Sequence, residues 1–199
     1  MQKYAHSILL PVLVVTGQLL ITGCGTTRPN FKTLAQTDPE WVLAHEDSLL
    51  AACPNSEELK QVLVELYLTN GCAAYAAADW SAATDNFEHV QVLHPRQREA
   101  RYWAAMSTGQ FHFKRGGPND LWEAIVKFGE AAVLDTASAA PHYWLARSYE
   151  KKNHDDFELI LEAYDKAFKK GLPPELTKEA EDLRAAVLHR KEIYEAFWK

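Results

Sequence analysis

The sequence is poor in cysteine and glycine and contains no block of basic residues. Its 199 residues include three cysteines and nine glycines, and Asp and Glu outnumber Lys and Arg by 27 to 21. Binding to nucleic acid requires a local excess of Lys and Arg, so nucleic acid is not expected as a partner. The same shortage argues against attachment to anionic lipid through a charged surface.

Strand signals are also missing. After residue 24, no segment alternates Val, Ile or Thr with polar residues, whereas Ala, Leu, Glu and Lys are common. This composition predicts an all-α protein. The segment 24–199 is long enough for one domain with its own hydrophobic core.

One apolar stretch, from Ser7 to Thr22, lies near the N-terminus. It is shorter than the roughly 20 apolar residues of a membrane span, and Pro11, Gly17 and Gln18 interrupt it. We therefore interpret it as the core of a signal peptide. Only one positive charge precedes this core, and a retained signal anchor is the alternative.

The stretch ends in Ile21-Thr22-Gly23-Cys24, which resembles the lipobox of bacterial lipoprotein signal peptides. The resemblance implies that residues 1–23 are removed and that Cys24 receives acyl chains such as palmitate, which anchor a periplasm-facing protein. Gly25 follows, rather than the Asp that retains enteric lipoproteins in the inner membrane, and this favours the outer membrane. Residues 24–37 are polar and predict a flexible tether, followed by a helical domain at 38–199.

Helix start and stop signals divide the remaining sequence. Asp38-Pro39-Glu40 supplies a cap, a proline at the first helical position and an acid in the first turn. His94-Pro95, the loop 116–120 and the segment 171–174 are breaks. We predict eight helices whose short connections make neighbours antiparallel: 39–52, 56–77, 80–93, 96–113, 120–134, 140–152, 156–170 and 175–198.

An apolar triplet recurs along these helices. It consists of a small or aliphatic residue, an aromatic residue four positions later and a small residue three positions after that, so its members share one helix face. The triplets are Ala83, Phe87 and Val90; Ala124, Phe128 and Ala131; and Ile160, Tyr164 and Ala167. We expect these side chains to form the core between neighbouring hairpins.

This pattern, with Pro95 after the first triplet and Trp144 in the helix before the third, resembles the tetratricopeptide repeat (TPR) family. The resemblance covers residues 64–173 and implies antiparallel helix hairpins stacked as a short right-handed solenoid. Extra residues around 113–119, and the absence of most of the family's first-helix Gly and Tyr, depart from the pattern. An open stack needs polar caps, a role that fits helices 39–52 and 56–77 at one end and 175–198 at the other.

In TPR folds the first helices of the units line a concave groove. By that resemblance, we predict a partner groove on helices 96–113 and 140–152. Its residues would be Tyr102, Met106, Gln110, His142, Leu145 and Tyr149. The loop from Lys114 to Asp120 is the alternative location. Tryptophans often anchor partners, but Trp122 and Trp144 are interpreted as core residues.

Catalytic and metal-binding patterns are missing. The eight histidines lack the paired spacing of a zinc site, and no phosphate-binding loop or nucleophile motif is present. We therefore predict no metal, no cofactor and no enzymatic activity. Cys53 and Cys72 are predicted to be unpaired, packed thiols, because the helix between them separates them by far more than the roughly 7 Å that a disulfide spans.

Two functions fit these features. The first is a non-enzymatic scaffold or assembly factor for a complex of the cell envelope, which binds another envelope protein or a peptide. The second is a small-ligand carrier or accessory receptor for a solute-transport system. A carrier needs a concave apolar pocket with a few converging polar groups.

Overall fold

The computed structural model describes residues 30–198 of the chain. Within that range the regular structure is entirely α-helical, as predicted. Its helices are α1 (Phe31–Thr37), α2 (Pro39–Ala44), α3 (Glu46–Ala52), α4 (Glu57–Ala76), α5 (Trp80–Leu93), α6 (Arg98–Arg115), α7 (Pro118–Leu134), α8 (Ala140–Lys152), α9 (Phe157–Lys170) and α10 (Pro174–Phe197). The predicted signal peptide and Cys24 lie outside the described residues. No helix in this range is long and apolar enough to cross a membrane.

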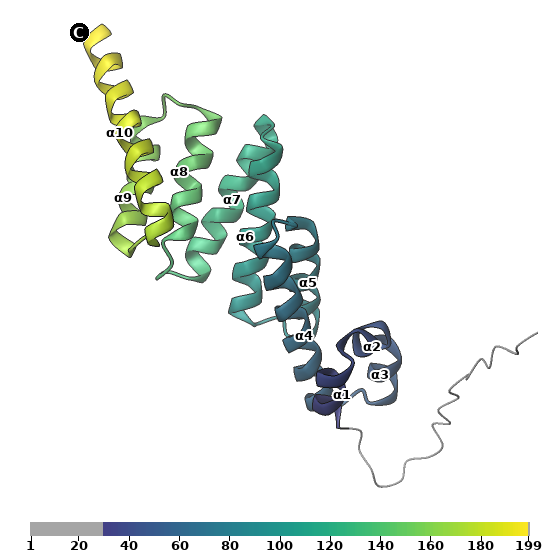
Figure 1. Ribbon diagram of the computed structural model, residues 1–199. Coiled ribbons are helices and arrows are strands. Elements are labelled where there is room, and N and C mark those ends of the chain that lie inside the picture. Colours follow the sequence, from purple (N-terminus) through teal and green to yellow (C-terminus); the bar gives the residue numbers. More distant parts are fainter. Residues whose placement is uncertain (1–29, 199) are drawn as a thin grey trace, which may run out of the picture.

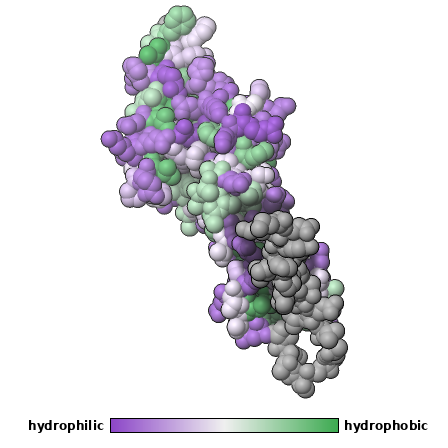
Figure 2. Space-filling model, turned by 45° about the vertical axis from the view of Figure 1, so that its right-hand side comes forward, coloured by the Kyte–Doolittle hydropathy of each residue, from purple (hydrophilic) through white to green (hydrophobic). Residues whose placement is uncertain are grey.

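From α4 onward the helices form a solenoid of antiparallel hairpins (Figure 1). The hairpins are α4–α5, α6–α7 and α8–α9, and each packs against the next. Helices α1 to α3 pack around the start of α4, and α10 covers α9 at the other end. The stack is elongated, with α1 and the end of α10 at opposite extremes. Much of the face in Figure 2 is purple, as expected for a polar exterior.

Two features of the N-terminal region differ from the prediction. Residues 31–37, expected to belong to the tether, form α1, whose Phe31 is buried in the core around α4. Residues 31–37 therefore belong to the helical part of the chain and not to a tether. The helix expected at 39–52 is divided at His45, where the imidazole Nδ1 donates a hydrogen bond to the Trp41 carbonyl, 2.9 Å away, and the two rings stack.

Local sequence sets the helix ends. The side chains of Asp38, Ser56 and Asp79 each accept a hydrogen bond from the backbone amide three residues later, which satisfies a donor that the first helical turn leaves free. Gly116 and Gly171 end α6 and α9 with φ values of +70° and +84°. Residues that carry a side chain rarely adopt this left-handed backbone conformation, so glycine is favoured at both positions.

All eight residues predicted for the repeat core are fully buried: Ala83, Phe87, Val90, Ala124, Phe128, Ala131, Tyr164 and Ala167. The two phenylalanine rings rest on glycines of the preceding helix. A Cβ atom at Gly71 would lie 2.7 Å from the Phe87 ring, and one at Gly109 would lie 2.6 Å from the Phe128 ring. First-helix glycines, which we expected to be mostly absent, are therefore present in two hairpins.

Each of these phenylalanines also stacks on a tryptophan of the next hairpin. The pairs are Phe87–Trp103, with ring centroids 6.4 Å apart and planes at 20°, and Phe128–Trp144, at 6.0 Å and 21°. A further ring, Tyr75 or Phe113, meets each tryptophan edge-on. The two junctions between hairpins thus have the same construction, which makes the described part of the chain a helical repeat with a solenoid-like fold.

Replacing Gly109 with Ala should destabilise the protein, because the new methyl group would collide with the buried Phe128 ring. Overpacking of this kind costs about 1–3 kcal/mol. Gly129 in α7 is the matched control: nothing lies within 4 Å of a Cβ built there. Gly129→Ala should therefore raise stability by about 1 kcal/mol through helix propensity. Urea denaturation measures the free energy of unfolding of both variants. Equal changes in that free energy would contradict the close packing at Gly109.

Removing a ring from either junction should be more costly. Phe87→Ala and Phe128→Ala each delete a fully buried side chain, and such truncations destabilise proteins by about 3–5 kcal/mol. The free energy of unfolding from chemical denaturation is the measurement. A loss below about 1 kcal/mol, typical of surface positions, would mean that these rings do not hold the stack together.

Candidate partner-binding surface

The residues predicted to line a partner groove do not form one open surface. On α6, Tyr102, Met106 and Gln110 are buried, with exposed fractions of 9%, 1% and 4%. Helix α6 lies in the middle of the stack, where Tyr75 of α4 and Trp144 of α8 pack against the same cluster. The prediction that these three residues line a groove is therefore wrong, because their side chains belong to the core.

On α8 the predicted groove residues are half-buried. Leu145 and Tyr149 pack against the core that α8 shares with α9 and α10. Burial, together with nearby Lys170 and Lys166, lowers the pKa of His142, so its imidazole is neutral at pH 7. These three residues offer a narrow strip without charge.

Exposed and half-buried aromatic and basic side chains gather elsewhere, where α6 ends, α7 begins and α8 ends. We call this group the aromatic–cation cluster. In it a cation lies over each aromatic ring, at 4.6 to 5.9 Å from the ring centroid. Its members are Phe111, Phe113, Arg115, Trp122, Arg147, Lys151 and Lys152.

Lys151 joins α8 to the end of α6. Its ammonium donates a hydrogen bond to the Phe113 carbonyl, 2.9 Å away, and lies 4.6 Å from the Phe113 ring centroid. The last carbonyls of a helix lack partners within it and carry partial negative charge, so a cation there is favourable. Gly116 leaves room for the contact, since a Cβ atom at that residue would lie 2.7 Å from the ammonium.

Asp120 connects the loop between α6 and α7 to the last turn of α6 through two polar contacts. Its carboxylate lies 2.9 Å from His112 Nδ1 and 3.3 Å from Arg115 Nε. The Arg115 guanidinium in turn lies over the Phe111 ring. The segment from Lys114 to Asp120, our alternative location for a partner site, is therefore tied to α6 at both ends.

Trp122, predicted to be a core residue, is 54% exposed. Its neighbours Leu121, Ala124 and Ile125 take the buried face of α7, and this leaves Trp122 on the outer face. The Lys152 ammonium lies 5.3 Å from its ring centroid. Trp144 is half-buried and packs in the core, as expected for a tryptophan at a hairpin junction.

The charges of the cluster are only partly balanced. Arg115 pairs with Asp120, and Arg147 pairs with Glu179 of α10 at 2.5 Å. Within residues 30–198, Lys151 and Lys152 form no ion pair with a carboxylate. A chain with a net charge of −6 thus presents the Lys152 ammonium beside an exposed indole and the Lys151 ammonium over the Phe113 ring, both without a carboxylate partner in this range.

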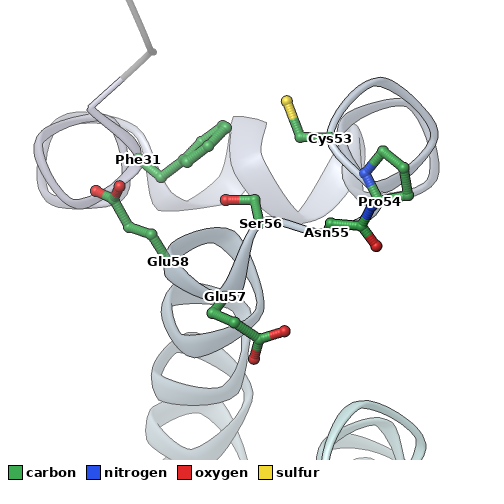
Figure 3. A pocket seen from close by; sticks show the side chains of 7 residues that line it. All are labelled: Phe31, Cys53, Pro54, Asn55, Ser56, Glu57 and Glu58. Carbon is green, nitrogen blue, oxygen red and sulfur yellow. The ribbon is translucent and has the colours of Figure 1, made fainter.

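A hollow of about 450 Å³ lies at the other end of the molecule, between the starts of α1 and α4 and the end of α3 (Figure 3). Phe31, Cys53, Ser56, Glu57 and Glu58 are among its lining residues. The two carboxylates point to different sides of α4, and Glu57 pairs with Lys60 at 3.0 Å. These groups do not converge on a common ligand position.

Metal and thiol groups add no further site within the described residues. In that range, no three His, Cys, Asp or Glu side chains lie close enough to share a metal ion. Cys53 and Cys72 are unpaired, as predicted. Cys72, however, is exposed rather than packed, because it lies on the outer face of α4.

No protein-family model matches the sequence, and no curated protein matches it. Among solved structures, the chain is similar to a chain of a CopN-Scc3 complex. The two are 20% identical, and the match covers 68% of this chain and 74% of that chain with a TM-score of 0.45. So loose an overlap has no bearing on function, which must be inferred from the residues themselves.

Proposed function

We propose that this protein is a membrane-anchored scaffold that binds another protein of the cell envelope through the aromatic–cation cluster. The observation that carries the proposal is the exposed Trp122 with Lys152 beside it, together with Lys151 over the Phe113 ring, because neither lysine has a carboxylate partner within the described residues. Tryptophan and arginine are the residues that most often anchor protein interfaces. They project here from helices of a packed stack, so little conformational entropy is lost when a partner binds.

The charge of the cluster indicates the chemistry of the partner. Lys151 and Lys152 lack carboxylate partners within the described residues, and the Trp122 indole beside Lys152 is uncharged. A segment that combines Asp or Glu with an apolar side chain would match both features. Attraction between such a segment and the cluster should weaken as salt is added.

The small-ligand alternative receives less support. The hollows described for residues 30–198 have volumes of about 340 to 570 Å³ and open to the surface, with charged side chains among their linings. A carrier site is instead concave, mostly apolar and largely closed around its ligand. We therefore favour a protein partner.

The double variant Trp122→Ala, Lys152→Gln tests the binding surface. Both side chains are exposed, so the fold should remain intact. The partner would be identified by affinity purification of the intact protein and mass spectrometry, and its affinity would then be measured by calorimetry. We expect the double variant to bind roughly tenfold or more weakly, because truncating an aromatic anchor costs 1–2 kcal/mol or more.

Val133→Ala is the matched control, since Val133 is 74% exposed on the same helix and lies outside the cluster. It should bind as the unaltered protein does. Equal binding by the double variant and the control would place the partner site elsewhere. Failure to recover any stoichiometric protein, together with a small molecule that co-purifies, would favour the carrier.

Membrane attachment through Cys24 is a separate part of the proposal. Two or more acyl chains hold a protein stably on a membrane, whereas a single chain gives only marginal binding. Cys24→Ser should abolish incorporation of labelled palmitate and move the protein from the membrane fraction to the soluble fraction. A Cys24→Ser protein that still incorporates palmitate would contradict the assignment of Cys24.

A further inference from the structure

The last turns of α10 extend beyond the helix against which they pack. Helix α10 has 24 residues and α9 has 14, so their lengths differ by about 15 Å. Phe157, at the start of α9, packs against the Tyr194 ring with centroids 5.6 Å apart. In Figure 1 the yellow end of α10 projects past the loop that joins α8 to α9.

This projecting end is apolar. Ile193, Tyr194, Phe197 and Trp198, which we call the α10 tip, are 58%, 47%, 79% and 70% exposed. Residues four positions apart lie on the same helix face, so the four side chains form two adjacent rows. Hydrophobic green marks this end of the molecule in Figure 2, above a mostly purple body. At 150–250 Å² per aromatic side chain, the exposed area is about 500 Å².

The α10 tip carries both a protrusion and a depression. A hollow of about 340 Å³ lies at its base, lined by Phe157, Arg190, Ile193, Tyr194 and Phe197 among others. The Trp198 ring lies next to it, 6.1 Å from the Tyr194 ring centroid. The hollow is large enough to hold an indole. A surface that supplies both a protrusion and a matching depression can pair with itself about a two-fold axis.

Charges around the α10 tip favour a second copy over a strongly charged partner. Arg190 pairs with Glu150 at 2.6 Å, and Lys191 pairs with Glu158 at 3.0 Å, so both cations are neutralised within the chain. Glu192 and Glu195 remain exposed, which disfavours an anionic membrane surface. Two tips together would bury about 1,000 Å², at the low end of specific protein interfaces.

From this geometry we infer that the α10 tip is a self-association surface, through which two copies of the chain form a weak, reversible dimer. The α10 tip shares no residue with the aromatic–cation cluster, although both border the end of α8, and the inference does not depend on the proposed partner.

Sedimentation velocity of the 199-residue chain carrying Cys24→Ser tests this inference without an acyl anchor. We expect a monomer–dimer equilibrium that shifts toward dimer with concentration and is not weakened by added salt. The double variant Phe197→Ser, Trp198→Ser should raise the dissociation constant at least tenfold. Its altered residues lie on the last turn, so circular dichroism should be unchanged.

Val92→Ser, Val133→Ser is the matched control, because these valines are 79% and 74% exposed on other helices. It should dimerise as the parent chain does. A chain that stays monomeric at all concentrations, or a dimer that persists in the tip variant, would overturn the inference. So would binding of the monomer to neutral lipid vesicles that the tip variant loses, since the tip would then be a lipid contact.

Discussion

The stack depends on the fit of one phenylalanine ring between two neighbouring helices at each junction. Phe87 and Phe128 lie on Gly71 and Gly109 of the preceding first helix and stack on Trp103 and Trp144 of the following one. A glycine is needed because any side chain would occupy the space of the ring, and the ring is needed because a smaller side chain would leave a cavity. The geometry of both junctions follows from this fit.

The same fit explains why the middle of the solenoid offers no open groove. It brings neighbouring helices close to α6, so the side chains of Met106 and Gln110 are enclosed. Only residues at helix ends and on outer faces stay accessible, and there the hairpin connections bring groups from different helices together. Lys151 shows the consequence, because it both caps α6 and exposes a charge beside the Phe113 ring.

At the two ends of the stack the repeat stops for different reasons. Helices α1 to α3 close the first end with Phe31 and Val42 against α4, and the Tyr67 hydroxyl donates to the Glu46 carboxylate across that contact. At the other end, α10 meets the core with the aliphatic residues Ala180 and Val187 in place of a tryptophan. The contact between α9 and α10 therefore differs from the two phenylalanine–tryptophan junctions, and the remaining length of α10 extends past its neighbour with the α10 tip uncovered.

The sequence by itself determined the helices from α4 onward and the buried stripe. Caps such as Asp38 and Ser56, breaks such as Gly171, and the spacing of Phe87, Phe128 and Tyr164 depend on interactions within a few residues, which local pattern records. It also indicated the loop from Lys114 to Asp120 as a second place for a partner site. Whether Cys24 is acylated depends on sequence features outside the described residues, and that prediction stands on the sequence alone.

Tertiary structure decided which faces remain open. A helical pattern shows that Trp122 and Tyr102 are both aromatic residues on amphipathic helices, but it does not show how many neighbours surround each helix. Packing buries Tyr102 on the central α6 and leaves Trp122 on the outer face of α7. The contact between Lys152 and Trp122 has the same origin, since residues about 30 positions apart meet only when the hairpins stack. Exposure is a property of the assembled core, whereas helix formation is largely a property of local sequence.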